Sequence, residues 1–438
     1  GIKPIDMVVC NLYPFEEVIS KRRFTHEEAI ENIDIGGPTM VRAAAKNYKD
    51  VAIIVDPADY DFILKELKSK RRGLSFETKE RLSLKAFEHT KRYDSIISLY
   101  LRQRIEEEIG LPQHIDLSLE KKQDLRYGEN PHQKGALYSA EGGSASGGKT
   151  KDQRPKTKNI VDAKQLHGKE LSFNNILDLD SAWTLVNYFV DPTVAIIKHT
   201  NPCGVGQGKS IDIAYKKAYE ADPVSAFGGV IGANRYVNSK MAKALEGAFV
   251  ECIIAPGYDG KALKILKKKK NLRILELAQE RSIQRLHDLD YKKVSGGFLV
   301  QEADVVHLTM SDIKIVSKKH PTLHEIKDLF FAWGVCKHVK SNAIVIAKDG
   351  KTLGIGAGQG SRVESVEIAL KKAKEGAHRA VLASDGFFPF RDSIDIAGAS
   401  GISAIIEPGG SVRDKEVIKA TNAHGITLLF TGRRHFKH

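Results

Sequence analysis

Short apolar runs alternate with amphipathic, charged segments along almost the entire chain. In the first third, residues 7–12 and 51–55 are apolar runs that predict buried strands. Asp56 and Pro57 follow the second run, and they supply an N-cap and a proline at the first helical position. Residues 75–109 show helical periodicity with many charges, which predicts more than one helix. This alternation of strands and helices indicates an α/β fold.

The same alternation continues to the end of the chain and includes a hairpin predicted around Asp349-Gly350. We find no repeat of fixed period, although two successive α/β layers of similar length fit the pattern after residue 125. Strands in largely parallel or mixed sheets are predicted at residues 194–198, 229–231, 250–255, 272–275, 343–347, 353–356, 380–383, 404–406 and 427–430.

One stretch interrupts the periodic pattern and predicts a domain boundary. Residues 110–124 lose periodicity and contain Pro112, so we predict a first domain over residues 1–112 and a linker over 113–124. The second domain then spans residues 125–438. Within it, residues 139–158 are rich in Gly, Ser and Lys, which predicts a mobile surface loop.

The composition excludes several classes of protein. A length of 438 residues allows two or three domains. No run of about 18 apolar residues occurs, so no transmembrane helix is predicted. Gly1 is not followed by a charged and then apolar leader, which predicts no signal peptide and fits part of a longer chain. The cysteines are few and widely spaced, which argues against a disulfide framework and fits a reducing cytosol; they are Cys10, Cys203, Cys252 and Cys336.

The net charge of +13 has two interpretations. A lysine-rich, heat-tolerant surface explains it, and so does the steering of anionic partners such as phosphates, carboxylates or nucleic acid. A nucleic-acid-binding module would account for the charge, but the sequence contains no RRM, KH or zinc-knuckle pattern.

The first chemical cluster follows the first predicted strand. Asn11 and Tyr13 stand at its carboxyl end, where open α/β sheets bind ligands. Gly36-Gly37 would let backbone amides approach a ligand, and Asp34 and Lys46 would form an acid/base pair. A turn followed by a helix with a structural ion pair explains the same residues.

The second cluster is Lys198-His199 at the end of the apolar run 194–198. Histidine titrates near neutral pH and is the usual general base, although a single histidine at a strand end is more often structural. Since adjacent strand residues face opposite ways, either the strand ends here or only one of the two points into a site. Pro202-Cys203 is like the start of the P-C-x-x-C motif of zinc deaminases, but Gly206 replaces the second cysteine, so we exclude zinc.

Four further segments combine polar, glycine and aromatic residues. Residues 125–133 place Arg126 beside Tyr127, which suits a phosphate and a stacked ring, or only a surface turn. Residues 354–362 put glycines between a strand and a helix capped by Ser361, which is an anion-binding arrangement. Residues 384–392 offer aromatic rings and carboxylates for a flat heterocycle, or form a hydrophobic corner. The tail 433–438 is basic, and chain ends usually fray.

Taken together and in this order, the motifs resemble the bifunctional AICAR transformylase / IMP cyclohydrolase family over essentially the whole chain. The cyclohydrolase part is matched by NLYPF, IDIGG and RAAAKN. The transformylase part is matched by LRYGENPHQ, KHTNPCG, SNA with GIGAGQ and SR, SD-x-FFPF-x-D, and the C-terminal R-x-F-x-H. Each motif alone is weak, whereas the set is highly specific.

The resemblance implies a fold and an assembly. It implies a partial methylglyoxal-synthase-like α/β domain, followed by a transformylase domain of two cytidine-deaminase-like halves without zinc, at about residues 125–315 and 316–438. The first domain lacks the family's initial strand and phosphate-binding loops, so it is expected to be truncated. A cytoplasmic homodimer with shared active sites is implied, with no nucleic-acid or membrane partner.

The resemblance also implies the reaction and its residues. A formyl group would pass from 10-formyltetrahydrofolate to AICAR, giving formyl-AICAR and a reduced folate, and formyl-AICAR would close to IMP. Lys198 and His199 would be the catalytic pair for formyl transfer. In the first domain Lys46 would carry the acid/base role beside Tyr13 and Asp34. The nucleotide would be held by Arg126, Tyr127, Gly228, Glu251, Asn342, Arg362, Phe387 and Arg434, and in the first domain by Cys10, Asn11 and Ile35; the folate would be lined by Val363, Asp392, Ser411 and Val412.

Overall fold

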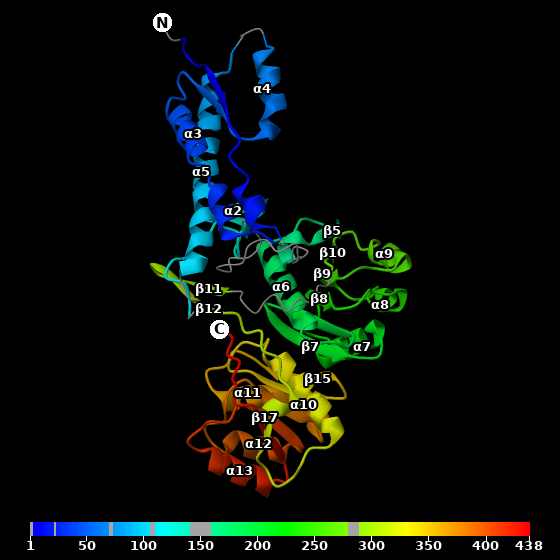
Figure 1. The fold of residues 1–438 in the computed structure, drawn as a ribbon. Coiled ribbons are helices and arrows are strands. Elements are labelled where there is room, and N and C mark those ends of the chain that lie inside the picture. The colour runs from blue at the N-terminus through cyan, green and yellow to red at the C-terminus, as the bar shows by residue number, and fades with distance from the viewer. Residues whose placement is uncertain (1–2, 22, 70–72, 106–109, 141–158, 279–288) are drawn as a thin grey trace. The chain divides into compact units, whose positions relative to one another are not determined.

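The computed structural model describes residues 3–21, 23–69, 73–105, 110–140, 159–278 and 289–438 (Figure 1). Most of the predicted mobile loop at residues 139–158 lies outside the described residues. The chain forms two compact units, which we describe separately. Unit 1 takes the described residues of Gly1–Ser118, Ala140–Lys156 and Gln284–Ala303, and unit 2 takes those of Leu119–Ser139, Thr157–Ile283 and Asp304–His438.

Unit 1 contains a two-stranded parallel sheet with helices and a separate hairpin. Its elements are β1 (Met7–Val9), α1 (Phe15–Ile19), α2 (His26–Glu31), α3 (Gly36–Lys46), β2 (Ala52–Ile54), η1 (Pro57–Asp59), α4 (Tyr60–Leu67), α5 (Phe76–Ile105), β11 (Leu289–Val294) and β12 (Gly297–Glu302). β1 pairs with β2, and α3 and α5 pack on β2 through Val41, Ala45, Ile53 and Ala86, all buried. As predicted, Asp56 caps the helical segment that begins at Pro57.

Two predictions about the secondary structure of unit 1 are wrong. The strand predicted to be buried at residues 7–12 is partly exposed, since Val9 in β1 is 52% exposed. The charged region after Ser75 forms a single helix, α5, rather than several. No glycine or proline occurs between Phe76 and Ile105, so nothing in the backbone interrupts the helix. Apolar residues spaced along it reach three different clusters, through Leu82, Ala86 and Tyr100 respectively, which explains why its hydrophobic pattern resembles that of separate helices.

Unit 2 is built on a mixed sheet of twelve strands in the order β13-β18-β17-β16-β14-β15-β7-β6-β8-β9-β10-β5. The first half holds η2 (Ile160–Asp162), β5 (Lys164–His167), α6 (Phe173–Asn187), β6 (Thr193–Lys198), β7 (Asn201–Gln207), α7 (Ile211–Ala221), β8 (Gly229–Ala233), α8 (Ser239–Ala244), β9 (Val250–Ala255), α9 (Gly260–Leu266) and β10 (Arg273–Glu276). The second half holds η4 (Met310–Asp312), β13 (Lys314–Ile315), α10 (Leu323–Cys336), β14 (Ile344–Lys348), β15 (Lys351–Gly356), α11 (Arg362–Ala373), β16 (Val381–Ser384), α12 (Asp392–Ala399), β17 (Ala404–Glu407), α13 (Asp414–Ala423) and β18 (Thr427–Phe430).

All nine strands predicted after residue 190 are present, including the hairpin at Asp349-Gly350. The central strand β7 was missed because its sequence, NPCGVGQ, contains a proline and two glycines, which are depleted in strands. A small sheet of β3 (Leu119–Leu125) and β4 (Gly135–Ala140) precedes the large one. β3 begins inside the segment predicted as a linker.

The two halves of unit 2 repeat the same order of elements. Ser172 and Thr322 cap α6 and α10 with the same capping box, and they lie 150 positions apart. Trp183 and Trp333 follow at the same spacing inside these helices, and both are buried. The two successive α/β layers of similar length that fit the pattern after residue 125 are therefore present, and equivalent residues in them lie 150 positions apart, a period that we did not detect in the sequence. The two halves share few residue types, so the repeat shows mainly in backbone structure.

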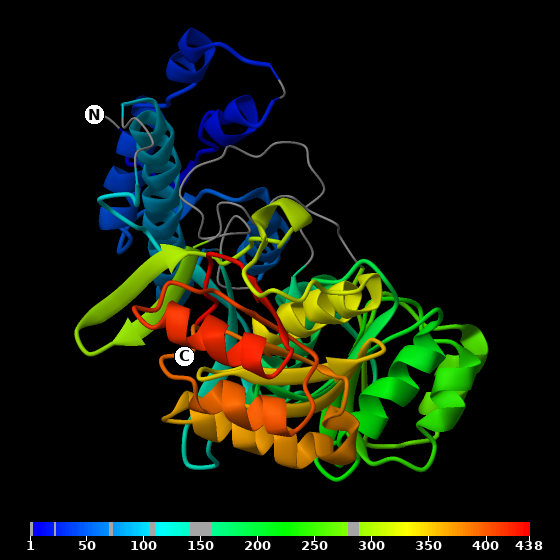
Figure 2. The ribbon, with the colours of Figure 1, turned by 90° about the horizontal axis from the view of Figure 1, so that it is seen from below.

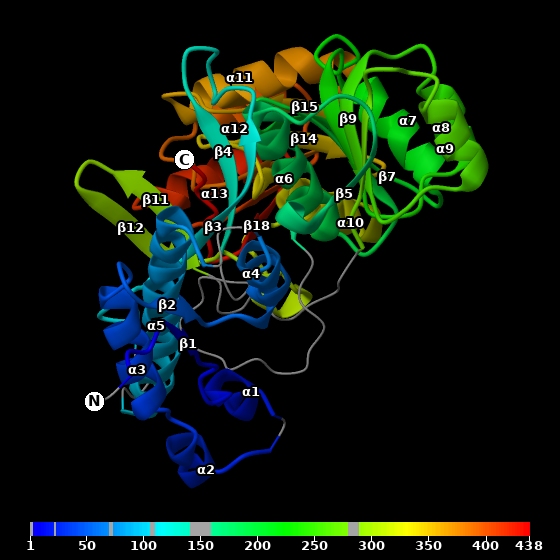
Figure 3. The ribbon, with the colours of Figure 1, turned by 90° about the horizontal axis from the view of Figure 1, so that it is seen from above.

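Helices cover both faces of the large sheet (Figure 2, Figure 3). α6 and α10 share one core that spans both halves, whereas α7 to α9 and α11 to α13 form separate cores on the other face. Successive residues of β6 alternate between these cores, with Ile196 in one and Ile197 in the other. No described helix is both long and apolar enough to cross a membrane.

The strand directions determine which loops meet. β6 is antiparallel to β7, β7 to β15, β15 to β14, and β14 to β16, while β16, β17 and β18 are parallel. Consequently β6, β15, β16, β17 and β18 all run in one direction, and their carboxyl ends lie at the same end of the sheet. We call this end of the sheet the composite end. β14 runs the opposite way, so the Asp349-Gly350 turn lies at the other end.

Candidate active site

A tight turn at the composite end carries His199. β6 ends at Lys198 and β7 begins at Asn201, so His199 and Thr200 form the two-residue turn between them. Both have positive φ values, 53° and 61°, as a type I′ turn requires. Residues other than glycine rarely adopt this conformation. The strand therefore ends before the histidine, which answers the question that the sequence left open, and His199 is exposed.

Lys198 connects this turn to the start of β8. Its Nζ donates a hydrogen bond to the carbonyl oxygen of Phe227 at 2.9 Å. Gly228 follows with φ of +72°, and its amide donates to the carbonyl of Phe249 at 2.9 Å. The structure thus brings Lys198 and Gly228 together. Glu251, at the start of β9, instead forms an ion pair with Arg273 at 2.6 Å.

A second group of predicted residues forms one hydrogen-bonded network. Arg362, nearly buried at the start of α11, donates through Nη2 to Oδ1 of Asn342 at 2.8 Å and through Nη1 to the carboxylate of Asp385. The amide of Lys340 donates to Oδ1 of Asn201 at 3.0 Å, beside the His199 turn. Loops from the two halves therefore meet at the composite end, which suits a site assembled from both.

The C-terminal tail is packed, which rules out the alternative that it is only a frayed basic end. His435 is buried, its amide donates to the carbonyl of Asp385 at 3.1 Å, and its ring pairs with Asp304. The amide of Ser341 donates to the carbonyl of Lys437 at 2.9 Å. Arg434 remains exposed between these anchors, with its guanidinium 4.6 Å from the centre of the Phe436 ring.

The predicted folate side consists of loops that follow strands of the second half. Phe387 and Phe390 are 40% and 47% exposed, whereas Phe388 is buried, so only two of the three predicted aromatic rings can contact a ligand. The Arg413 guanidinium lies 4.7 Å from the centre of the Phe390 ring, which joins the loops after β16 and β17. Val412 is fully exposed beside them, Ser411 donates its amide to Asp414, Asp392 accepts from the Ser393 amide, and Val363 is half-buried at the start of α11.

Glu407 ends β17 beneath these loops and is completely buried. Its Oε2 accepts a hydrogen bond from the Phe388 amide at 2.7 Å, and its Oε1 has no partner among the described residues. Burial raises the pKa of Glu407 to about 8, although the Phe388 amide acts in the opposite direction. Burial therefore favours the protonated, uncharged form of this side chain.

Replacing Glu407 with glutamine should change how stability depends on pH. In the unfolded chain the carboxyl ionises near 4.5, so this group's contribution to folding is fully present below that pH and is lost as the pH rises through about 8. Relative to Glu407→Gln, the wild type should lose about 1.4 kcal/mol of unfolding free energy per pH unit across this window. Urea unfolding of both proteins at pH 5.5, 7 and 8.5 measures this, and parallel stability curves would contradict it.

Arg126 and Tyr127 lie in the turn after β3. The Arg126 guanidinium sits 4.8 Å from the centre of the Tyr127 ring, and Nη2 donates to the tyrosine hydroxyl at 3.0 Å. The carbonyl of Glu129 in the same turn accepts from Nδ2 of Asn174 at 3.2 Å. This contact connects the turn to the amino end of α6.

Unit 1 brings two of its predicted site residues together. The Tyr13 amide donates to Oδ2 of Asp34 at 3.2 Å, and the Gly37 amide donates to Oδ1 at 2.7 Å. Cys10 lies nearby, and burial followed by the Asp34 charge raises the pKa of its thiol. Asn11 and Ile35 are exposed close to them in sequence. This group can present backbone amides, a carboxylate and a phenol to a ligand.

Lys46 does not join this group. Asp34 precedes α3 and Lys46 is its last residue, so helix length separates their backbones by about 15 Å. The direct acid/base pair is therefore wrong, and so is the structural ion pair that was its alternative. Spacing along the sequence was compatible with either arrangement, and only the continuous helix excludes both.

Several residues with clear structural roles at these sites were missed by sequence reasoning. Phe227, Arg273 and Glu407 give no local motif. Asp178 contacts the His199 turn from α6, and the repeat could have revealed it, because Asp328 occupies the same place 150 positions later.

Known proteins resemble this chain over its full length. The family described as AICARFT/IMPCHase bienzyme matches residues 44–372. The bifunctional purine biosynthesis protein PurH of Bacillus cereus (strain B4264) is 51% identical over 438 residues, which is 100% of this chain and 82% of that protein. The PurH proteins of Acetivibrio thermocellus (strain ATCC 27405) and Bacillus mycoides (strain KBAB4) match with the same identity and coverage. A family match over most of the chain and an identity of this size together establish that the chain belongs to the AICARFT/IMPCHase bienzyme family.

Proposed function

We propose that this chain is the bifunctional enzyme of purine biosynthesis that formylates AICAR and closes formyl-AICAR to IMP. Its family and its PurH relatives support both activities. The structural observation that carries the first activity is the placement of Lys198, the last residue of β6, and of His199 in the turn that follows. Both lie at the composite end beside the Asn342–Arg362–Asp385 network.

The chemistry of formyl transfer explains why these two side chains suit the site. The AICAR amine attacks the formyl carbon of 10-formyltetrahydrofolate, and it must lose a proton as the new C–N bond forms. His199 accepts that proton. Lys198 stabilises the tetrahedral oxyanion, and the folate nitrogen takes up a proton as its bond to the formyl carbon breaks. The products are formyl-AICAR and tetrahydrofolate.

We propose the binding residues from the resemblance to the family, and exposure and charge support two of them. Arg126 and Arg434 are exposed guanidinium groups suited to the nucleotide phosphate, with Tyr127, Gly228, Glu251, Asn342, Arg362 and Phe387 as the other nucleotide contacts. Val363, Asp392, Ser411 and Val412 would line the folate. In unit 1, Tyr13 and Asp34 would move protons in ring closure, and Lys46 would act on the same substrate from the other end of α3, without contacting Asp34. Cys10, Asn11 and Ile35 would lie near the nucleotide.

The remaining features of the proposal concern fold, assembly and location. We propose that unit 2 is a transformylase built from two cytidine-deaminase-like halves, which the repeated order of elements in its mixed sheet supports, and that unit 1 is part of a methylglyoxal-synthase-like domain, which rests on the family resemblance alone. We further propose a cytoplasmic homodimer with shared active sites and no nucleic-acid or membrane partner. Sedimentation equilibrium tests the dimer.

The decisive experiment follows tetrahydrofolate production from 10-formyltetrahydrofolate with AICAR as acceptor. The proposal expects turnover that requires both substrates, and the absence of product would contradict it. A filter-binding assay with RNA and DNA at physiological salt tests the alternative explanation of the +13 charge.

The packed tail yields a prediction that separates binding from folding. Arg434→Ala removes an exposed guanidinium and should raise the KM for AICAR about tenfold or more without changing Tm. His435→Ala removes a buried anchor and should destabilise the protein by about 1–3 kcal/mol. Steady-state kinetics and thermal melts of both variants provide the test. An unchanged KM in Arg434→Ala would remove this residue from the nucleotide site.

A further inference from the structure

The turn that carries His199 is held by a carboxylate from a neighbouring helix. Asp178 lies near the amino end of α6, and its Oδ1 accepts a hydrogen bond from the Thr200 amide at 2.6 Å. Both turn residues have positive φ values, a conformation that a histidine and a threonine rarely adopt without outside support. The hydrogen bond therefore acts on the part of the backbone from which the imidazole projects.

Asp178 is partly buried, which is consistent with a side chain that supports the turn rather than one that only faces solvent. Burial raises the pKa of Asp178, while the Thr200 amide and His199 lower it. A carboxylate that has lost part of its hydration gains most from amides held at fixed positions. The turn supplies such an amide.

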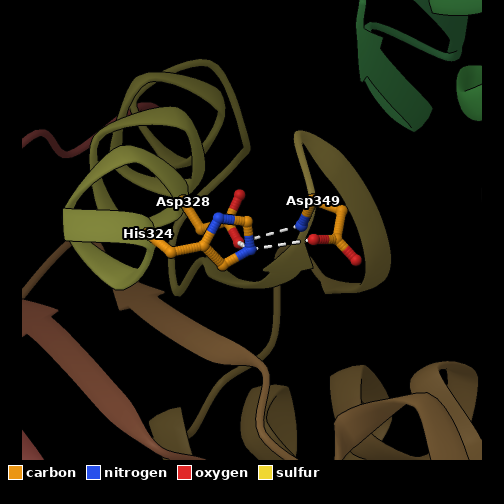
Figure 4. A group of neighbouring side chains, drawn as sticks. All are labelled: His324, Asp328 and Asp349. Atoms are coloured by element: carbon orange, nitrogen blue, oxygen red, sulfur yellow. Dashed lines mark hydrogen bonds and ion pairs between the residues drawn. The ribbon is translucent and has the colours of Figure 1, made fainter. Parts of the chain in front are cut away.

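The second half of unit 2 contains the same device without a histidine in the turn. Asp328 lies on α10, 150 positions after Asp178, and its two oxygens accept hydrogen bonds from the amides of Asp349 and Gly350, each at 2.8 Å. Figure 4 shows Asp328 and Asp349 together with His324, whose Nε2 is 2.8 Å from Oδ1 of Asp349. The side-chain atoms of these three residues that could bind a metal ion lie within 4.8 Å of one another. Both oxygens of Asp328, however, already accept hydrogen bonds from the turn amides.

The two turns differ in how much they depend on the carboxylate. Gly350 occupies the second turn position in β14–β15 and adopts a φ of +65° without steric cost, whereas Thr200 occupies that position in β6–β7. The first turn therefore needs its carboxylate more than the second does. It also lies at the composite end, with His199 in the place of Asp349.

We propose that Asp178 is a positioning residue for formyl transfer, which keeps His199 in its productive geometry by holding the Thr200 amide. This rests on the proposed role of His199 as the general base. The competing view is that Asp178 only helps the hairpin to fold. The two views differ in whether the effect of Asp178 on the rate passes through His199.

The test compares Asp178→Asn with its matched control, Asp328→Asn. Both substitutions are nearly isosteric and weaken amide–carboxylate bonds to equivalent turns. Asp178→Asn is expected to lower kcat by about 10-fold to 100-fold with little change in the KM for AICAR, because a small displacement of a catalytic group has effects of this size. Asp328→Asn should leave kcat unchanged. An Asp178→Asn enzyme with the kcat of the wild type would overturn the proposal.

A double-mutant cycle with His199→Ala separates positioning from folding. If Asp178 acts through His199, Asp178→Asn should cause no further loss of kcat in the His199→Ala background, and an equal loss in both backgrounds would overturn the proposal. Asp178→Glu keeps the carboxylate and should be faster than the asparagine variant; equal rates would contradict it. If the asparagine variant does not fold, the glutamate variant enters the cycle instead, and its loss must likewise vanish. A His199→Ala enzyme with normal kcat would instead refute the proposed function itself.

Discussion

Replacing His199 with alanine is expected to lower kcat for formyl transfer by about 10²-fold or more, since general bases contribute about 10² to 10⁴ to enzymatic rates. The acidic limb of the pH–rate profile should disappear with it, because that limb reports protonation of the base. The residue is exposed in a turn, so its removal should leave Tm almost unchanged. Kinetics across pH, together with thermal melts, measure both quantities.

The repeat supplies a control for this substitution. Asp349 occupies the same turn position in β14–β15, and Asp349→Ala should keep the kcat of the wild type. A purely structural histidine would behave differently. If His199 were purely structural, the His199→Ala variant would be less stable and its folded fraction would keep a nearly normal kcat. That result would remove His199 from the mechanism.

Lys198→Ala should also lower kcat strongly, by about 10² to 10³, because a donor aimed at an oxyanion contributes about this much. Lys198→Arg keeps the charge but replaces a compact ammonium with a planar guanidinium, so it should recover only part of the rate. The ammonium lies 2.9 Å from the Phe227 carbonyl, a position that the bulkier group cannot reproduce. Binding of AICAR should survive both changes, because the proposed phosphate contacts are Arg126 and Arg434.

Lys348 is the matched control for Lys198. It ends β14 as Lys198 ends β6, and its Nζ donates to the His378 carbonyl at 3.1 Å. Lys348→Ala should keep kcat, and the dissociation constant for AICAR should be unchanged in all three variants. If Lys348→Ala and Lys198→Ala lower kcat equally, the effect of Lys198 is one of hairpin stability rather than of charge at the reacting carbon.

Regular elements could be predicted from the sequence, because apolar runs and turn residues report local structure. The predicted hairpin at Asp349-Gly350 is present because that dipeptide favours positive φ values at both positions. The turn at His199-Thr200 also has positive φ values at both positions, but histidine and threonine rarely adopt them, so these residues do not predict a turn of this type. Its Thr200 amide donates to Asp178, which lies on another element, so no local pattern could indicate this contact.

The residues of the candidate site were predicted from motifs, and the structure shows which of these residues contact one another. Asn342 and Arg362 belonged to one motif in the sequence, whereas Asp385 belonged to another, and the structure joins all three through the Arg362 guanidinium. Asp34 and Lys46 show the opposite outcome, since residues twelve positions apart are separated by the helix between them. Glu407, whose Oε1 has no partner among the residues that the structure describes, is buried by the packing of the whole fold, which a sequence pattern does not report.

The antiparallel contact between β7 and β15 has an evolutionary consequence. Two copies of a single half, joined through this contact as separate chains, would be related by a twofold axis, and selection on one turn would act on both. Fusion of the copies into one chain removes that constraint. One turn can then acquire a histidine while its twin acquires Asp349 and Gly350, so the protein can specialise one end of its sheet and leave the other free to change.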